Sequence, residues 1–203
     1  MHDQSSISPY PILDPQTVPI TGNMMIEASA GTGKTYTITL LVLRLLLGLN
    51  EDKTPKKLPE ILIVTFTNAA TAELKERIYS RIVELKRAFL QHMLGETVAD
   101  SALLALVEAY LAAPQPLSLA QESEAIFAQD SPQAPRYHAA LNLLIEAEGA
   151  IDQAAIFTIH AFCQRLLKEN ALDLGQPFNF ELVEDLSDYY REAVYHFWRE
   201  ECY

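Results

Sequence analysis

Residues 27–35 read Glu-Ala-Ser-Ala-Gly-Thr-Gly-Lys-Thr, and this stretch predicts the fold around it. Its last three residues match the end of the phosphate-loop pattern G-x-x-x-x-G-K-[ST], while Ala28 stands where that pattern has its first glycine. We expect the whole loop to contact a bound nucleotide. The expected nucleotide-binding residues are Ala28, Ser29, Ala30, Gly31, Thr32, Gly33, Lys34 and Thr35.

Each residue type in this loop has a physical role in holding phosphate. Small residues let the backbone wrap an anion and turn its N–H groups inward, and Gly31 and Gly33 can adopt torsions that other residues avoid. A helix starting at Gly33 points its positive end at the phosphates. Lys34 supplies a charge to the β and γ oxygens, and Thr35 supplies a hydroxyl to Mg²⁺ held through the nucleotide. We therefore expect ATP and Mg²⁺ as ligands, with Lys34 and Thr35 as catalytic residues. The alternative is a glycine turn that only joins a strand to a helix.

Strand and helix patterns alternate on either side of the loop. The predicted elements are a strand over residues 23–28, a helix over 33–47, a strand buried on both faces over 61–66, a long helix capped by Thr67 or Asn68, a strand over 155–158 and a helix over 159–170. This order predicts an α/β fold with a parallel sheet. Ligands of such sheets bind at the carboxyl ends of the strands.

The long helix has one apolar face, because its apolar residues recur every three or four positions. These residues are Ala70, Leu74, Ile78, Ile82, Leu85 and Phe89. The region that follows, residues 95–150, is rich in alanine, leucine and acidic residues and is interrupted by prolines. We expect it to form two or three short helices inserted into the core.

Composition and charge restrict the class of protein. The chain has 203 residues and a net charge of −12, which taken alone argues against a nucleic-acid partner. However, residues 1–90 hold 10 lysines and arginines against 9 acidic residues, so a modest basic face could persist there. The most apolar run, residues 38–49, is too short to cross a membrane and contains Arg44. No secretory signal and no cysteine framework are evident, so we expect a cytoplasmic protein without a membrane partner.

Three stretches together resemble the superfamily 1 DNA helicases of the UvrD/Rep type. They are the phosphate loop, VTFTNAATAELKERI at residues 64–78 and FTIHAFCQRLL at residues 157–167. In that family an alanine at the opening position of the loop is usual. The resemblance implies a partial RecA-like parallel sheet of a P-loop NTPase with helical insertions. The family's base-reading glutamine has one candidate, Gln16, at a shorter spacing than usual.

The second and third stretches resemble motifs that contact single-stranded DNA. The resemblance assigns DNA contact to Thr65, Phe66, Thr67, Asn68, Thr158, His160 and Phe162. Small polar groups at a strand end can hold phosphates, and an aromatic ring can stack on a base. The alternative is structural: Phe66 lies in the core, Thr67 only caps a helix, and His160 is a helix-start histidine. The chain has Ala69 where stand-alone helicases often carry lysine.

The detail of the three motifs resembles one branch of the family, the RecB type, the beta chain of exodeoxyribonuclease V. This implies an ATP-dependent DNA helicase with an associated exonuclease, acting on single-stranded DNA at duplex ends in bacterial double-strand-break repair and recombination. RecC-type and RecD-type subunits are the implied partners. An AddA-type or stand-alone UvrD/Rep-type helicase is a near alternative. A P-loop phosphotransferase and a non-catalytic interaction module are alternatives of other classes.

The motifs divide the chain into five expected regions. These are an extended segment at residues 1–22, the ATP-binding core at 23–94, the helical insertion at 95–150, a return to the core at 151–172, and at 173–203 the start of a second helicase subdomain that continues beyond this sequence. The water-activating acidic pair, the arginine fingers and the nuclease carboxylates of the family have no clear counterpart here. We therefore expect this chain to bind nucleotide weakly and not to hydrolyse it.

Overall fold

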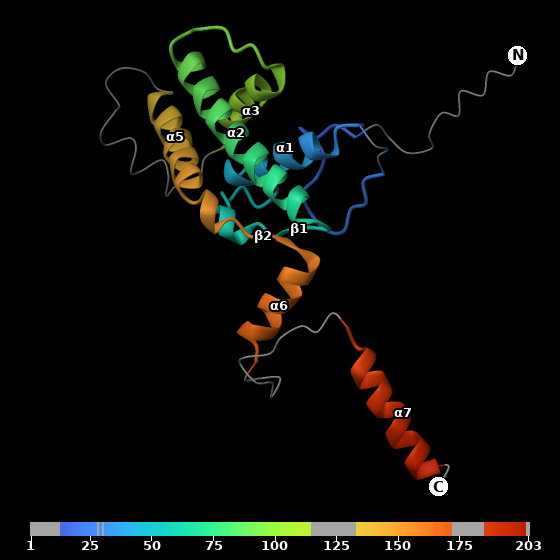
Figure 1. The fold of residues 1–203 in the computed structure, drawn as a ribbon. Helices are drawn as coiled ribbons and strands as arrows, with labels where there is room; N and C mark the ends of the chain where they lie inside the picture. The colour runs from blue at the N-terminus through green and yellow to red at the C-terminus, as the bar shows by residue number, and fades with distance from the viewer. Residues whose placement is uncertain (1–12, 28, 30, 115–132, 172–184, 202–203) are drawn as a thin grey trace, which may run out of the picture. The chain divides into compact units, whose positions relative to one another are not determined.

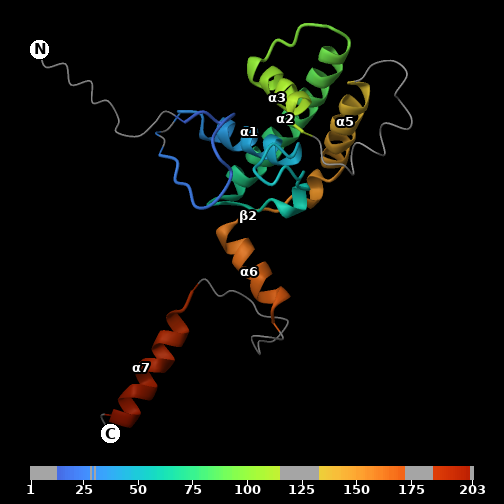
Figure 2. The ribbon, with the colours of Figure 1, turned by 180° about the vertical axis from the view of Figure 1, so that it is seen from behind.

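The computed structural model describes residues 13–27, 29, 31–114, 133–171 and 185–201. The chain divides into two units, residues 1–159 and residues 160–203. Within the first unit, helices α1, α2, α3 and α5 surround a common core, and the strands β1 and β2 lie side by side at one edge (Figures 1 and 2). No helix of the described residues is long and apolar enough to cross a membrane.

Helix α1 spans Lys34–Leu46 and follows the phosphate loop directly. Its buried residues include Leu40, Leu43 and Leu46, which form one face at helical spacing. The helix ends at Leu46 with Leu47 as its C-cap, and Gly48 follows with a φ of 69° in the left-handed region. A Cβ atom at Gly48 would lie 2.9 Å from the backbone nitrogen of Pro55, so the loop after α1 packs against a position that only glycine fits. The predicted helix over residues 33–47 is confirmed.

The sheet consists of two parallel strands, β1 at Ile63–Thr65 and β2 at Ile156–Thr158. Ile63 pairs with Ile156, and Thr65 pairs with Thr158. The parallel direction and the strand at residues 155–158 are confirmed. The expected burial of residues 61–66 on both faces is wrong: Leu62 is 49% exposed and Val64 is 43% exposed. Helices cover one face of this strand, and its other face is open within the described chain.

The strand predicted over residues 23–28 does not form over residues 23–27, which run as irregular chain. Ala28 lies outside the described residues. A strand needs a neighbour to complete its ladder of hydrogen bonds, and the two described strands pair with each other. The apolar side chains of this segment consequently face solvent, with Met25 91% exposed and Met24 47% exposed.

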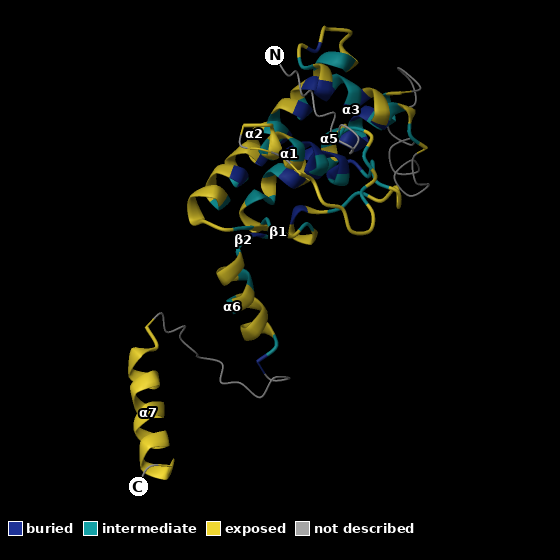
Figure 3. Ribbon diagram, turned by 90° about the vertical axis from the view of Figure 1, so that its right-hand side faces the viewer, coloured by how far each residue is buried: buried dark blue, intermediate teal, exposed yellow. Residues whose placement is uncertain are grey.

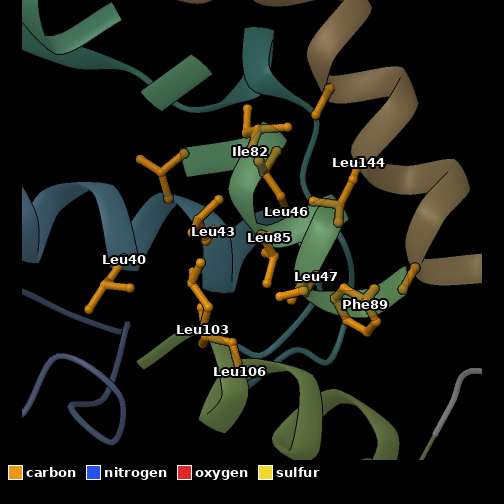
Figure 4. Close-up of a cluster of buried hydrophobic side chains, with 14 of the residues drawn as sticks. Leu40, Leu43, Leu46, Leu47, Ile82, Leu85, Phe89, Leu103, Leu106 and Leu144 are labelled. Carbon is orange, nitrogen blue, oxygen red and sulfur yellow. The ribbon is translucent and has the colours of Figure 1, made fainter. Parts of the chain in front are cut away.

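Helix α2 spans Asn68–Met93 and is the central element of the first unit. Its N-cap is Thr67, whose hydroxyl accepts a hydrogen bond from the backbone N–H of Ala70 at 3.1 Å. The predicted apolar stripe is buried from Leu74 to Phe89, whereas Ala70 is exposed in the first turn. Figure 4 shows side chains of this stripe packed against three other helices. The core residues labelled in Figure 4 are Leu40, Leu43, Leu46, Leu47, Ile82, Leu85, Phe89, Leu103, Leu106 and Leu144.

Two further helices, α3 at Ser101–Ala112 and α5 at Ala134–Gly149, pack on α2. Single-turn helices at Leu58–Glu60 (η1) and Ile151–Gln153 (η2) lead into β1 and β2. Helices α3 and α5 make up most of the described part of residues 95–150. Its helices contribute Leu106 and Leu144 to the same core as α1 and α2.

Ion pairs join the acidic region to the lysines of the first 90 residues. Lys57 Nζ lies 2.7 Å from Glu146 Oε1, and Lys75 Nζ lies 2.8 Å from Asp152 Oδ1. A third pair joins Lys86 and Glu148. Exposed pairs of this kind contribute at most about 1 kcal/mol each to stability. They nevertheless place three acidic residues of 91–153 against lysines of the first 90 residues, which leaves less positive charge for a nucleic acid.

The N-cap residue of α3, Asp100, has a lowered pKa. Asp100 accepts hydrogen bonds from the backbone N–H groups of Ala102 and Leu103, and it pairs with Arg81 at 2.7 Å. Burial raises the pKa of this carboxyl, but the hydrogen bond and charge of Arg81, together with the backbone donors, lower the pKa by more, so it lies below 3.8. A depressed folded-state pKa stabilises the fold above the unfolded-state pKa. That contribution is lost as the pH falls through the folded-state pKa.

Replacing Asp100 with alanine is expected to lower the free energy of unfolding at pH 7 by about 1 kcal/mol, because the cap is lost. Asp100→Asn keeps the capping oxygen and removes only the charge. Urea unfolding between pH 7 and pH 3 should show the gap between the wild type and Asp100→Asn closing below about pH 4. A gap that is constant with pH would contradict the assignment of Asp100 as a stabilising charge.

The second unit contains most of α6, which spans Ile159–Glu169, and α7, which spans Ser187–Glu201. The predicted helix over residues 159–170 is confirmed. Neither helix has a fully buried residue, and α7 in particular is exposed along its length (Figure 3). Its large exposed side chains are Tyr189, Tyr190, Val194, Tyr195, Phe197 and Trp198.

Candidate functional site

The phosphate loop has the backbone torsions that its sequence predicts. Gly31 has a φ of 80° and Gly33 has a φ of 87°, both in the left-handed region that favours glycine. Gly33 is also the N-cap residue of α1, so the N–H groups of the first helical turn start directly at the loop. Ala28 and Ala30 lie outside the described residues.

The carbonyl oxygen of Ser29 is the centre of the described part of this loop. It accepts hydrogen bonds from the backbone N–H of Thr32 at 3.4 Å, from the hydroxyl of Thr32 at 2.8 Å and from the ammonium group of Lys34 at 2.7 Å. The ammonium group of Lys34 is therefore folded back over the loop, next to the start of α1. A phosphate oxygen is a stronger acceptor for an ammonium group than a carbonyl oxygen. An anion in the loop could therefore replace the Ser29 carbonyl oxygen as the acceptor of the hydrogen bond from Lys34.

A polar cavity of about 430 Å³ begins at Thr35 and continues between α1 and α2. Its walls include Tyr36 and Thr39 of α1 and three glutamates of α2, Glu73, Glu76 and Glu84. Arg77 and Arg81 line the same cavity and pair with Glu73 and Glu84, so they offset the charge of two of the three carboxylates. Thr35 also lines the cavity, where its hydroxyl can face a cation held by the nucleotide. No cluster of metal-ligating side chains occurs within the ranges that the structure describes.

Of the residues that line this cavity, the sequence singled out Thr35 but not Tyr36 or Arg81, which contact each other. The guanidinium carbon of Arg81 lies 5.3 Å from the centre of the Tyr36 ring, and Arg81 also pairs with Glu84 and Asp100. This contact joins the first turn of α1 to the middle of α2. Tyr36 could have been noticed in the sequence because it follows the motif residue Thr35. Nothing in the sequence indicates that Tyr36 contacts Arg81.

Gln16, the candidate for a base-reading glutamine, lies in a turn at the opposite end of α1. Its backbone N–H donates to Asp14 Oδ1 at 3.0 Å. The guanidinium of Arg44 donates to the carbonyl oxygens of Pro15 at 2.9 Å and Val18 at 2.7 Å, on either side of Gln16. Arg44 is ten residues after Lys34, which corresponds to about 15 Å along the helix axis. The structure therefore does not bring this turn to the phosphate loop.

The second group of predicted residues lies where β1 ends and α2 begins. Thr65 is the last residue of β1, and its partner across the sheet is Thr158, the last residue of β2. Phe66 is 88% exposed, so the alternative that places its ring in the core is wrong. Thr67 caps α2, and Asn68 is exposed at the first position of that helix. The structure thus brings five of the seven predicted DNA contacts to one edge of the sheet.

The other two predicted contacts, His160 and Phe162, lie in the second unit and are described within α6. His160 is exposed in the first turn of this helix, and Phe162 is half-buried. Thr158 belongs to the first unit, so the stretch from Thr158 to Phe162 crosses the boundary between the two units in the sequence.

These features define a class: a helix-rich α/β protein in which a phosphate loop opens a helix and two parallel strands end in threonines. A family model described as UvrD/REP helicase N-terminal domain matches residues 14–200. The chain belongs to this family. The resemblance seen in the three sequence motifs is confirmed over nearly the whole chain.

The similar proteins with curated descriptions include several RecB subunits. The chain is 42% identical over 194 residues to the RecBCD enzyme subunit RecB of Escherichia coli (strain K12), and the match covers 94% of this chain and 14% of that protein. It is 40% identical over 193 residues to the RecBCD enzyme subunit RecB of Haemophilus influenzae, with coverage of 94% and 14%. The same subunit of Buchnera aphidicola subsp. Acyrthosiphon pisum is 34% identical over 189 residues. The chain spans about 14% of the length of these relatives.

Proposed function

We propose that this chain is the ATP-binding and single-stranded-DNA-binding N-terminal part of an ATP-dependent DNA helicase and nuclease subunit. Such a subunit acts in bacterial double-strand-break repair and recombination, in the cytoplasm, on single strands at duplex ends. Its partners would be RecC-type and RecD-type subunits, in keeping with the RecBCD enzymes of which its relatives are subunits. The two described strands would belong to a RecA-like sheet, and the five sequence regions remain the proposed domain division.

The phosphate loop supports the nucleotide-binding part of the proposal. Gly31 and Gly33 hold the torsions that turn backbone N–H groups toward an anion, and α1 directs its positive end to the same place. Lys34 would exchange the carbonyl oxygen of Ser29 for phosphate oxygens. Mg²⁺, carried by the nucleotide and faced by Thr35, would neutralise the charge that develops on the phosphates. The remaining groups for hydrolysis would be supplied outside this chain.

The exposure of Phe66 carries the DNA-binding part of the proposal. An exposed aromatic ring at the carboxyl edge of a parallel sheet can stack on a base of a single strand. Thr65, Thr67, Asn68 and Thr158 would position the adjoining phosphates through hydroxyl, amide and backbone groups. His160 and Phe162, in the second unit, are proposed as further DNA contacts. Because stacking needs no net positive charge, it is compatible with a chain of net charge −12.

Replacing Phe66 with alanine is expected to weaken the binding of single-stranded DNA roughly 5- to 100-fold, because stacking contributes about 1–3 kcal/mol per base. Fluorescence anisotropy of a dye-labelled oligothymidine at low salt measures this. Tyr79→Ala is the matched control, since Tyr79 is a half-exposed aromatic residue of α2 away from the strand edge. Equal affinities for the wild type and Phe66→Ala would refute the proposed DNA contact. ATP binding without any DNA binding would favour the P-loop phosphotransferase instead.

A further inference from the structure

Two threonine hydroxyls, those of Thr65 and Thr71, contact each other next to the turn that carries Phe66. The hydroxyl oxygens of Thr65 and Thr71 are 2.6 Å apart. The carbonyl oxygen of Thr67 is 3.1 Å from the Thr71 hydroxyl and 3.2 Å from the Thr65 hydroxyl. The Thr65 hydroxyl also lies 3.5 Å from the carbonyl oxygen of Phe157 in β2. One residue of α2, Thr71, thus reaches the end of β1 and the cap residue of its own helix.

Two protons are available for these contacts, because each hydroxyl has only one. In one arrangement Thr65 donates to Thr71, and Thr71 donates to the Thr67 carbonyl. In the other, Thr71 donates to Thr65, and Thr65 donates to the carbonyl oxygen of Thr67 or of Phe157. Both arrangements use the short contact between the two hydroxyls. Removing the hydroxyl of Thr71 removes this contact in either arrangement. The backbone N–H of Thr71 still donates to the Thr67 carbonyl at 3.0 Å, but the Thr65 hydroxyl is then left with two competing carbonyl acceptors, those of Thr67 and Phe157.

The consequence falls on Phe66, which lies between the two residues that are held. Thr65 is held by the sheet and by its hydroxyl. Thr67 is held by its carbonyl and by its capping hydroxyl, which accepts from the N–H of Ala70. With both neighbours held, the backbone of Phe66 has little freedom. In this conformation Phe66 is 88% exposed.

We propose that Thr71 is a positioning residue for DNA binding: its hydroxyl holds the turn from Thr65 to Thr67 in the conformation that presents the ring of Phe66 to a base. This inference rests on the proposed function, in which Phe66 stacks on single-stranded DNA. Thr71 itself touches no base. It acts by keeping the ring in its binding position before the DNA arrives, so that less freedom is lost on binding.

The test compares Thr71→Val, which has nearly the same shape but no hydroxyl, with Thr71→Ser, which keeps the hydroxyl. Anisotropy with the dye-labelled oligothymidine should show roughly 2- to 10-fold weaker binding for Thr71→Val and wild-type binding for Thr71→Ser. Thermal unfolding and Mg-ATP titration of each variant report on the fold and on the phosphate loop. If Thr71→Val unfolds, Thr71→Ala removes the same hydroxyl with a residue of high helix propensity and should give the same loss.

A double variant separates positioning from a general structural effect. In a chain that already carries Phe66→Ala, adding Thr71→Val should cause no further loss of DNA affinity, because Thr71 acts through the ring. An additive loss would overturn the inference, and so would wild-type DNA binding by Thr71→Val when Phe66→Ala binds weakly. If Phe66→Ala itself binds like the wild type, the proposed DNA contact fails, and the inference fails with it.

Discussion

Replacing Lys34 with alanine is expected to weaken the binding of Mg-ATP by this chain about 100-fold or more, which corresponds to about 2.7 kcal/mol. The ammonium group of Lys34 lies at the start of α1, 2.7 Å from the Ser29 carbonyl oxygen that a phosphate oxygen would replace. Its loss removes charge-assisted hydrogen bonds from the β and γ oxygens. Calorimetric titration of Mg-ATP measures the change. Lys168→Ala is the control, because Lys168 is an exposed lysine of α6.

The same experiment tests whether the chain only binds nucleotide. The wild-type chain is expected to bind Mg-ATP and to release no phosphate over hours, because groups that activate water and stabilise charge each contribute several powers of ten in rate. Sustained hydrolysis that disappears in Lys34→Ala would contradict this expectation. Equal nucleotide affinities for the wild type and Lys34→Ala would contradict the assignment of the loop.

Replacing Phe89 with alanine is expected to lower the free energy of unfolding by about 3–5 kcal/mol. Phe89 is fully buried and meets Tyr110 of α3 edge to face, with ring centroids 5.6 Å apart. It meets Tyr137 of α5 in the same way at 6.4 Å. The substitution would leave a cavity where α2, α3 and α5 converge, and these helices are held together mainly by such contacts.

Urea unfolding followed by circular dichroism measures this effect. Leu90→Ala is the matched control, since Leu90 is the next residue of the same helix and is 39% exposed. It should cost less than about 1 kcal/mol. A similar cost for both variants would mean that the aromatic contacts of Phe89 do not stabilise the junction of the three helices.

Several features of the fold could be predicted from short stretches of the sequence. The torsions of Gly31 and Gly33, the cap at Thr67 and the apolar stripe of α2 were predicted because each depends on residues a few positions apart. The parallel pairing of β1 and β2 followed from the alternation of strand and helix. The family resemblance rested on the same local motifs.

Other features depended on residues that are distant in sequence. The segment 23–27 has a strand's composition but pairs with no strand among the described residues, and β1 has a buried strand's composition but exposed residues at Leu62 and Val64. Glu146 pairs with Lys57, which is 89 positions away in the sequence. Asp152 pairs with Lys75, which is 77 positions away. The sequence could not show whether the ring of Phe66 was buried or exposed.

Local sequence therefore determined where helices start, where glycine is required and which face of a helix is apolar. These outcomes depend on backbone torsions and on neighbours within one or two helical turns. Burial, ion pairing and the hydroxyl contacts of Thr71 were decided only by the tertiary structure. These three features depend on which atoms of distant parts of the chain pack against a strand or helix. The residues adjacent in sequence do not determine which atoms those are.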